Sequence, residues 1–371
     1  MTSGAIAGRH KDTLDTPALL VDLDRLERNI ERMQSIVAGA GVALRPHVKT
    51  HKCPEIARLQ AAAGARGVCC AKLGEAETMA AAGIDDLLVT TPIAGSAKLQ
   101  RAVEIARRAK LSVVADDAEA IRALSQAAGA GGVSMSVVVE VNVGQDRCGV
   151  PPGVEAARLA QLVEKSPGLR FAGLQGYHGR LQGIASYEAR RAEVRAALER
   201  LMVSVEQLRH HAIACSVLTG GGTGSAALDV ELRGLTELQP GSYVYMDSSY
   251  GKLAWDMQGA PIPFEQSLSV LSSVVSRPVK ERAVLDAGWK SLSCDSGMPV
   301  VRGLAGTTFE FAGDEHGTLR GIDAMNLRPG DRVELIPSHC DTTVNLYDRV
   351  LVCRGDVVVD AWTITGRGRS Q

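Results

Sequence analysis

The sequence predicts an α/β protein in which a (β/α)8 TIM barrel is followed by a mostly antiparallel C-terminal β-domain. From about residue 17 to 250, short β-branched runs alternate with alanine-rich stretches whose apolar residues recur at helical spacing. Repeated strand-then-helix units favour parallel strands joined by right-handed crossovers. After about residue 260 the helical periodicity fades, and strand-like runs are separated by Gly, Asp, Asn and Pro.

The first predicted strand is Leu19–Leu23, and the number of strands that follow it matches the eight that close a barrel. Those strands are Val42–Val48, Gly67–Lys72, Asp86–Thr91, Leu111–Asp116, Val137–Asn142, Phe171–Tyr177, Ser216–Thr219 and Glu237–Tyr245. The helices expected between them include Pro54–Ala63, Glu75–Ala82, Lys98–Arg108, Ala118–Ala128, Val154–Glu164 and Tyr187–His211. A doubly wound open sheet is the alternative, but the sequence lacks the G-x-G-x-x-G fingerprint that such a sheet usually carries after its first strand.

The C-terminal part is expected to be a separate β-domain. Its predicted strands are Gln266–Val275, Ala283–Asp286, Arg332–Ile336, Arg349–Cys353 and Val357–Thr365, the last two joined by a hairpin turn at Arg354-Gly355-Asp356. The leftover first strand can join this sheet and bring both ends of the chain into one unit. We therefore expect a barrel at residues 24–255 and a β-domain, carrying a metal site, at residues 1–23 plus 256–371.

Composition indicates a small-molecule partner. The 371 residues are 45% hydrophobic and carry a formal net charge of -1, so no overall field draws the chain to nucleic acid or to an anionic membrane. We also expect no membrane insertion and no signal peptide, because apolar runs stay well short of the ~20 residues that span a bilayer. Eight cysteines without a C-x-x-C pair favour reduced thiols and a cytoplasmic location.

A lysine among histidines follows the first barrel strand, in Arg45-Pro46-His47-Val48-Lys49-Thr50-His51-Lys52. Barrels build their active sites at the C-terminal ends of the strands, which is where Lys49 falls. Positive charge from Arg45, His51 and Lys52 is expected to favour the neutral amine of Lys49. Such an amine can form a Schiff base with a carbonyl compound. The alternative is an exposed lysine in a basic loop.

A glycine-rich loop, Thr219–Ser225, follows the seventh barrel strand. The backbone amides of Gly221, Gly222 and Thr223 can approach an anion at a helix start, and the eighth strand adds Gly241-Ser242-Tyr243 nearby. Barrels commonly hold phosphate at these two loops. A phosphate-bearing carbonyl cofactor beside a lysine is pyridoxal 5′-phosphate, although an ordinary turn is the alternative for the loop itself.

Two further barrel segments carry candidate residues. Arg147 lies in a loop after the fifth barrel strand and can face the cofactor ring, or form a salt bridge within its own loop. Tyr177 and His178 end the sixth barrel strand and offer an aromatic wall and an acid or base. A core tyrosine and a hydrogen-bonded structural histidine are the alternatives.

The β-domain carries Pro337-Ser338-His339-Cys340-Asp341. In an extended segment, alternation places His339 and Asp341 on one face. An imidazole with a carboxylate suits Mn²⁺, with Mg²⁺ or Zn²⁺ as alternatives, and water would fill the remaining positions. A hydrogen-bonded surface pair is the other interpretation.

Taken together, the motifs resemble the D-threonine aldolase and D-serine dehydratase group of fold-type III pyridoxal phosphate enzymes, which share their barrel with alanine racemase. The resemblance runs from about residue 12 to 368 and is carried by Asp15–Asp22, Arg45–Lys49, Gly67–Cys70, Arg147–Val150, Thr219–Ser225 and Pro337–Asp341. The glycine loop and the His-x-Asp pair resemble the branch of D-threonine aldolase and D-3-hydroxyaspartate aldolase, whereas the dehydratase branch usually has His-x-Cys.

The resemblance implies a homodimer that cleaves β-hydroxy-D-amino acids reversibly to glycine and an aldehyde. It implies that Lys49 is joined to the cofactor, that Arg147 and Tyr177 line its ring, and that His339 and Asp341 bind the metal. The remaining cofactor contacts implied are Thr223, Gly241, Ser242 and Tyr243.

Two positions depart from the aldolase pattern. Ala71 stands where aldolases of this group commonly carry a glutamine, and Gly183 stands where they carry a histidine that helps to deprotonate the substrate hydroxyl. His178 or a metal-bound hydroxide is the expected substitute. The alternative functions are a metal-dependent dehydratase of D-serine or 3-hydroxyaspartate, which gives a keto acid and ammonia, and a non-catalytic pyridoxal phosphate-binding protein.

Overall fold

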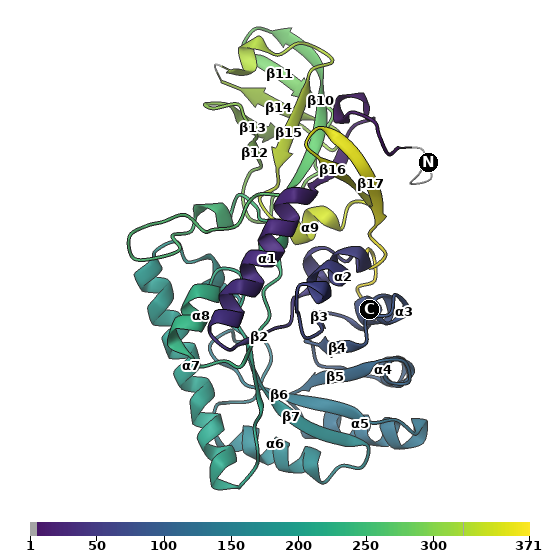
Figure 1. The fold of residues 1–371 in the computed structure, drawn as a ribbon, viewed down its shortest axis with the longest axis vertical. Helices are drawn as coiled ribbons and strands as arrows, with labels where there is room; N and C mark the ends of the chain where they lie inside the picture. Colours follow the sequence, from purple (N-terminus) through teal and green to yellow (C-terminus); the bar gives the residue numbers. More distant parts are fainter. Residues whose placement is uncertain (1–5, 322) are drawn as a thin grey trace.

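The computed structural model describes residues 6–321 and 323–371, so residues 1–5 of the predicted β-domain lie outside it. Figure 1 shows two parts stacked along the longest axis, with the β-domain above the barrel of strands and helices. The predicted fold class, a (β/α)8 barrel with a C-terminal antiparallel β-domain, is confirmed. The exact domain boundaries stay a prediction.

The barrel sheet is parallel throughout and follows the order β2-β9-β8-β7-β6-β5-β4-β3. A bridge between His47 and Cys69 joins the chain after β2 to β3, and the Arg66 amide donates to the Leu44 carbonyl over 2.8 Å. These contacts close the barrel. Its strands are β2 (Ala43–Leu44), β3 (Val68–Cys70), β4 (Asp86–Val89), β5 (Lys110–Ala115), β6 (Met135–Glu140), β7 (Leu169–Gly176), β8 (Val217–Gly220) and β9 (Glu237–Leu238).

Helices follow most of the barrel strands, with sequence signals at several of their ends. Proline stands at the first position of α2, where a missing N–H costs nothing, and Asp117 caps α5 by accepting the amides of Glu119 and Ala120. Gly132 ends α5 in the left-handed conformation that glycine adopts readily. The helices are α1 (Leu23–Gly39), α2 (Pro54–Ala62), α3 (Leu73–Ala81), α4 (Ser96–Ala106), α5 (Ala118–Gly131), α6 (Val154–Glu164), α7 (Tyr187–His210) and α8 (Ala226–Leu232).

The β-domain sheet combines both ends of the chain. Strand β1 pairs antiparallel with β10 and parallel with β16, so the leftover strand does join this sheet. Three short strands, β12 to β14, were not expected from the sequence. The strands are β1 (Ala18–Asp22), β10 (Leu268–Val279), β11 (Arg282–Leu285), β12 (Val300–Val301), β13 (Thr308–Phe311), β14 (Gly317–Arg320), β15 (Arg332–Ile336), β16 (Arg349–Arg354) and β17 (Val357–Thr363).

Two predicted barrel strands are much shorter than expected. The segments predicted as Val42–Val48 and Glu237–Tyr245 form the two-residue strands β2 and β9 and then turn into the short 3-10 helices η3 (Val48–Thr50) and η5 (Ser242–Val244). Pro46 and Pro240 stand at these breaks, and a proline has no N–H with which to continue a ladder. The result is that Lys49 and Ser242 lie on tight turns at the barrel mouth.

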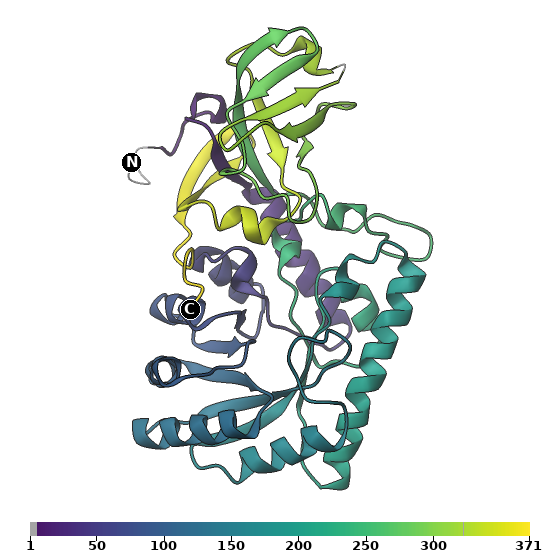
Figure 2. The same cartoon turned by 180° about the vertical axis from the view of Figure 1, so that it is seen from behind.

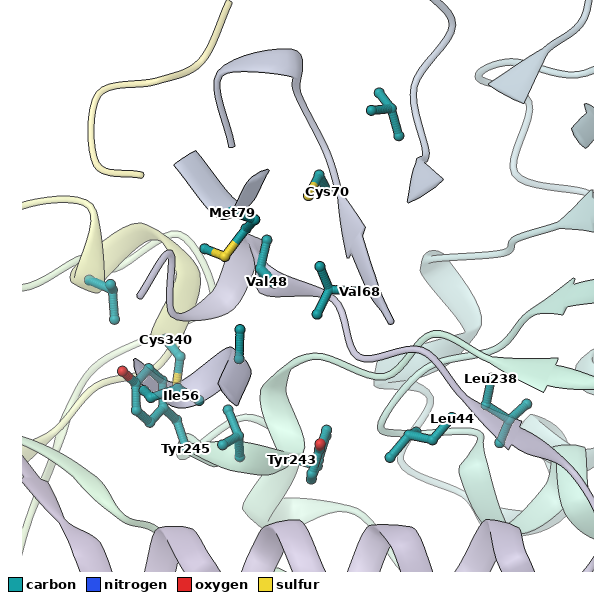
Figure 3. Close-up of a cluster of buried hydrophobic side chains, with 14 of the residues drawn as sticks. Leu44, Val48, Ile56, Val68, Cys70, Met79, Leu238, Tyr243, Tyr245 and Cys340 are labelled. Atoms are coloured by element: carbon teal, nitrogen blue, oxygen red, sulfur yellow. The ribbon is translucent and has the colours of Figure 1, made fainter. Parts of the chain in front are cut away.

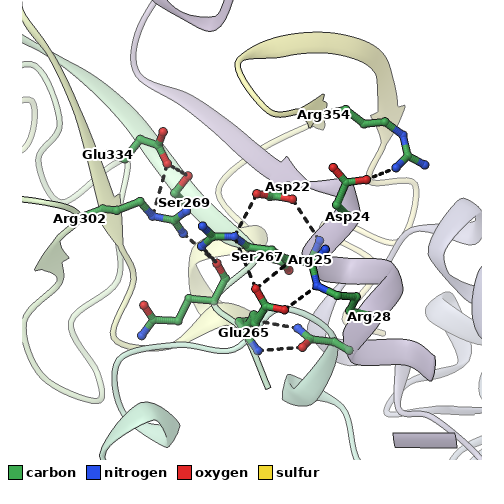
Figure 4. A network of polar contacts seen from close by, with 12 residues as sticks. Asp22, Asp24, Arg25, Arg28, Glu265, Ser267, Ser269, Arg302, Glu334 and Arg354 are labelled. Carbon is green, nitrogen blue, oxygen red and sulfur yellow. Dashed lines mark hydrogen bonds and ion pairs between the residues drawn. The ribbon is translucent and has the colours of Figure 1, made fainter. Parts of the chain in front are cut away.

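Helix α1 fastens the barrel to the β-domain. Its apolar face packs inward through Leu26, Ile30, Met33 and Val37, which recur at helical spacing. Figure 2 shows the helix running from the β-domain along the barrel. The polar network of Figure 4 holds the first turns of this helix, because Arg25 and Arg28 contact the segment just before β10, at Gln266 and Glu265 respectively.

A hydrophobic cluster lies directly beneath the barrel mouth, where the two parts meet (Figure 3). Val48 of the barrel and Cys340 of the β-domain are both fully buried in it, and Tyr245 and Ile56 lie beside Cys340 in the picture. Val48 is the neighbour of Lys49 in the sequence, and Cys340 is the neighbour of Asp341. Packing therefore fixes the backbone on both sides of the site.

Inside the barrel, a series of hydrogen bonds between polar side chains runs from Arg45 to Gln175 at the barrel mouth. Arg45 is 6% exposed and donates to Glu237 over 3.0 Å, and Glu237 accepts the Thr219 hydroxyl over 2.9 Å. The Gln239 amide then donates to Thr219 over 2.9 Å and to Gln175 over 3.0 Å. Buried polar groups of this kind are stable only when each one is paired.

We predict that Arg45→Met lowers the free energy of unfolding by about 3–5 kcal/mol, because the buried Glu237 carboxylate then loses its cation. Chemical denaturation measures the loss. The control is Arg58→Met on α2, where the half-exposed arginine contributes within about 0.5 kcal/mol. Equal stability of the two variants would contradict the interpretation.

Candidate active site

Lys49 stands at the mouth of the barrel on the 3-10 turn η3. His47 caps this turn, since its Nδ1 accepts the Lys49 amide over 3.3 Å, while its Nε2 lies 3.0 Å from the Thr90 hydroxyl. Val48 and Thr50 on either side are fully buried, whereas the Lys49 side chain is 40% exposed. The turn therefore presents one amine to an open cleft from an immobile backbone.

The partner of Lys49 comes from the β-domain: its Nζ lies 3.1 Å from Asp341 Oδ2. The negative charge of Asp341 raises the pKa of the Lys49 amine above its usual value, against the effect of burial. The expectation that neighbouring positive charge would favour the neutral amine is therefore wrong. Arg45 is turned into the barrel, and Lys52 lies 3.6 Å from Glu75.

His47 and His51 add no positive charge to the cleft. Burial, followed by the charge of Lys49, lowers the pKa of His47 to about 3. Burial also lowers the pKa of His51 to about 4, although its contacts with Cys53 and Gln60 oppose the shift. Both rings are neutral at physiological pH.

His339 and Asp341 lie close together, but not as predicted. The segment is not a continuous extended strand: His339 immediately precedes the short helix α9 (Cys340–Val344), and Asp341 lies in the first turn of that helix. The helix begins here because the buried Asp247 carboxylate accepts the Cys340 amide over 3.3 Å. His339 Nε2 is 3.9 Å from Asp341 Oδ1.

The pair fits a divalent cation in its donor chemistry. Within the described residues, Asp341 Oδ1 is buried without a hydrogen-bond partner and faces His339 Nε2. The other ring nitrogen of His339 is 2.5 Å from Asp295 Oδ2, a contact that orients the imidazole so that Nε2 is available as a ligand. Burial opposes ionisation of Asp341, but the charges of Lys49 and His339 lower its pKa to about 2.

Protein ligands supply only part of such a coordination shell. In the part of the chain that the structure describes, no group of three or more His, Cys, Asp or Glu side chains is arranged to hold a metal ion. Water and substrate would have to provide the remaining ligands, as in catalytic rather than structural metal sites.

The cleft around Lys49 combines several predicted residues. It is lined by His47, Lys49, Ala71, Thr90, Thr91, Arg147, Gln175, Tyr177 and Gln239. The Arg147 guanidinium lies over the Tyr177 ring, 5.7 Å from its centroid. Tyr177 and Gln175 point into the cleft from alternate positions of the β7 segment. The structure thus brings Lys49, Arg147 and Tyr177 together.

The predicted phosphate loop adjoins this cleft and is built from two connected turns. The Tyr243 amide donates to the Thr223 hydroxyl over 3.0 Å, which joins the glycine loop to the turn of Gly241 and Ser242. Gly241 approaches the lysine turn so closely that a Cβ there would lie 2.6 Å from Thr50 Oγ1. These two backbone segments form a cradle whose chemistry suits a phosphate group beside Lys49.

Two hydroxyl groups of these segments do not face the cradle. Ser225 is 2.6 Å from Asp229 Oδ2 and accepts the Gly222 amide over 3.1 Å, so its hydroxyl supports the loop from behind. The Tyr243 phenol accepts from Gln60 over 3.0 Å in the core. Tyr243 therefore contributes its backbone rather than its hydroxyl.

The structure does not bring His178 to Lys49. Among the described residues, His178 and Gly176 line a separate small cavity against α7, and Tyr177 and Gln175 line the cleft. The Leu181 amide donates to His178 Nδ1 over 3.4 Å. A catalytic role for His178 stays a prediction without geometric support.

Several site residues were missed by sequence reasoning. Gln175 could have been found, because strand alternation places it on the face of Tyr177. Tyr250 is half-buried near Ser242 and Asp341, and desolvation raises its pKa well above the usual value. Neither Tyr250 nor Asp295 lies in a pattern that would have marked it.

Comparison with known proteins agrees with this arrangement. The family model of the alanine racemase N-terminal domain matches residues 21–249, and that of a putative serine dehydratase domain matches residues 267–353. D-threonine aldolase from Arthrobacter sp is 46% identical over 362 residues, which cover 96% of this chain and 94% of the relative. 3-Hydroxy-D-aspartate aldolase from Paracoccus denitrificans (strain Pd 1222) is 36% identical over 370 residues, covering 98% of this chain and 95% of the relative. The crystal structure of D-threonine aldolase from Filomicrobium marinum matches with a TM-score of 0.96 at 41% identity and covers 100% of both chains.

The fold and the site thus define a barrel of the alanine racemase type with a dehydratase-type β-domain. Within that class, the chain belongs to the D-threonine aldolase branch of the fold-type III pyridoxal phosphate enzymes.

We predict that stability falls as the pH drops from 6.5 toward 4, in part because of His51. Its folded pKa of about 4 lies below the unfolded value of 6.5, so protons bind more readily to the unfolded chain in this window. At pH 4.5 this costs about 2–3 kcal/mol. Denaturant unfolding of His51→Gln between pH 7 and 4.5 should show a shallower decline, and an unchanged slope would contradict the assignment.

Proposed function

We propose that this chain is a carbon–carbon lyase that uses pyridoxal 5′-phosphate and a divalent cation to cleave β-hydroxy-D-amino acids, such as D-threonine, reversibly to glycine and an aldehyde. The observation that carries the proposal is the 3.1 Å contact between Lys49 Nζ and Asp341. In this proposal, the amine that binds the cofactor and the carboxylate that binds the cation are direct neighbours. The family membership and the names of the relatives support the same activity.

The residues present fit the cofactor. Lys49 would supply the amine for its aldehyde, Arg147 and Tyr177 would flank its ring, and Gly221, Gly222, Thr223, Gly241 and Ser242 would surround its phosphate, with the Tyr243 amide holding the Thr223 hydroxyl in place. When bound, the cofactor withdraws electrons from the bond that breaks at Cα.

His339 and Asp341 would hold the cation, with Mn²⁺ as our first choice and Mg²⁺ or Zn²⁺ as alternatives. A divalent cation at this place supplies Lewis acidity to a substrate hydroxyl. The chain itself orients the ligands, through Asp295 on His339 and through the buried Cys340 and Asp247 that fix the start of α9. His178 lies outside the cleft, so we assign it no role in proton transfer.

A dehydratase acting on D-serine or 3-hydroxyaspartate is the second candidate, because a dehydratase domain model matches residues 267–353. In a dehydratase the same cation would assist departure of the hydroxyl. Products distinguish the two: a keto acid and ammonia from a dehydratase, glycine and an aldehyde from an aldolase. The higher identity to the aldolases favours the first candidate.

We further infer a cytoplasmic homodimer. The eight cysteines lie within the described ranges and are free thiols, which is consistent with a reducing compartment. No helix of the described residues combines the length and the apolar character that crossing a bilayer would take. Fold-type III relatives usually complete their sites in pairs, and we expect the same here.

The first prediction concerns the reaction itself. Protein loaded with pyridoxal 5′-phosphate and Mn²⁺ should convert D-threonine to glycine and acetaldehyde, measured by amino-acid analysis and an aldehyde assay. Lys49→Ala should lose the visible imine band and at least about 10³-fold in turnover, because the covalent link is lost. If keto acids form and glycine does not, the aldolase function is wrong and the dehydratase function is favoured.

The second prediction separates the cation from the cofactor. Asp341→Ala should keep the visible band but lower turnover by about 10²-fold or more, since only the cation-binding side is removed. Treatment with a chelator should reproduce this loss in the parent protein, and added Mn²⁺ should reverse it. Full activity after the chelator would exclude the cation from the reaction.

The third prediction tests Asp295. Replacing it with Asn should weaken Mn²⁺ binding by about 10–100-fold, because the imidazole of His339 loses the carboxylate that orients it. Isothermal titration calorimetry measures the affinity. The exposed Asp314→Asn serves as the control, and an unchanged affinity at Asp295 would contradict its assigned role.

A further inference from the structure

A polar cluster beside the cleft joins the lysine turn, helix α9 and the C-terminal segment. Lys52 follows Lys49 by three residues, and its Nζ donates to Asn345 Oδ1 over 3.0 Å. Asn345 is the residue that ends α9, the helix that carries the cation-binding carboxylate. The same amide oxygen accepts the Gly368 amide over 3.5 Å. One side chain thus contacts both halves of the site and the last residues of the chain.

The backbone of Lys52 depends on these contacts. Its φ is 51°, a left-handed conformation that side chains other than glycine adopt only where the surroundings enforce it. The Lys52 amide donates to the Val48 carbonyl over 2.7 Å, and the Lys52 carbonyl accepts the Gly366 amide over 3.0 Å. The lysine turn is therefore stabilised by a hydrogen bond within the turn and by a second one to the C-terminal segment.

The C-terminal segment, residues 366–371, fits closely against the barrel. A Cβ at Gly366 would lie 3.0 Å from Lys52 Cβ, so the close approach uses a glycine. Further along, the Gly74 amide at the start of α3 donates to the Gln371 carbonyl over 3.1 Å. A Cβ at Gly74 would lie 2.7 Å from the Arg369 carbonyl oxygen. Both views in Figures 1 and 2 show this end of the chain beside α3.

We propose that Asn345 and the C-terminal segment are positioning elements of the active site, which hold the lysine turn at a fixed distance from helix α9. Only two residues lie between Lys49 and Lys52, and α9 is a single short helix, so we expect a displacement of Asn345 to move both Lys49 and Asp341. Small displacements of this kind impair catalysis strongly. The inference rests on the proposed function of Lys49 and Asp341.

Asn345→Ala tests the proposal in the protein loaded with pyridoxal 5′-phosphate. We expect Mn²⁺ affinity, measured by electron paramagnetic resonance, and kcat for D-threonine each to fall by about tenfold. KM should change less than kcat, because the reacting groups shift while the cofactor remains bound. Asn345→Asp keeps an oxygen acceptor for Lys52 and should retain values within about twofold of the parent. Leu346→Ala, at the next position, which is 37% exposed, is the matched control and should behave like the parent.

Removal of residues 366–371 is the second test. The truncation should reproduce the loss of Mn²⁺ affinity expected for Asn345→Ala and alter the visible band, because Lys52 loses its hydrogen bond to Gly366. A lower unfolding temperature with unchanged affinity, band and kcat in both variants would overturn the proposal and leave only a structural role. If the parent protein binds cofactor and Mn²⁺ but cleaves no D-threonine, the proposed function fails, while the affinity and the band still decide the present inference.

Discussion

One contact determines the chemistry of this molecule: the Lys49 ammonium meets the Asp341 carboxylate over 3.1 Å across the boundary between barrel and β-domain. Opposite charges at this distance attract strongly where solvent is partly excluded. In the function that we propose, each residue depends on the other, because the amine would bind a carbonyl cofactor and the carboxylate, together with His339, would bind a cation. Bringing them together defines the space in which a β-hydroxy amino acid can be held by both.

That contact requires rigid backbones on both sides. Val48 next to Lys49 and Cys340 next to Asp341 are fully buried in the same hydrophobic cluster, so the two site residues project from a shared core (Figure 3). Helix α1 and its ion pairs join the two parts at another point (Figure 4). The polar chain from Arg45 to Gln175 fixes the barrel interior below the cleft. A preorganised site of this kind needs little rearrangement when ligands bind.

The sequence predicted the barrel, the β-domain and the meeting of Lys49, Arg147, Tyr177, His339 and Asp341, because periodicity and motif position are local properties of the chain. It did not predict what depends on long-range pairing. The charge state of Lys49 was misjudged, since Arg45 turns to Glu237 inside the barrel and Asp341 comes from the other end of the chain. The extended form of His339–Asp341 was wrong because the buried Asp247 starts a helix there. The catalytic role of His178 stays a prediction, since that side chain lines a separate cavity, and Asp295 and Asn345 lie in segments without a recognisable pattern.

The most direct test is a crystal structure of the protein loaded with pyridoxal 5′-phosphate and Mn²⁺, with the metal located by its anomalous scattering. Our account predicts continuous density between the cofactor and Lys49 Nζ, and the manganese bound to His339 Nε2 and Asp341 within the same cleft. A metal bound elsewhere, or a cofactor joined to a different lysine, would contradict it.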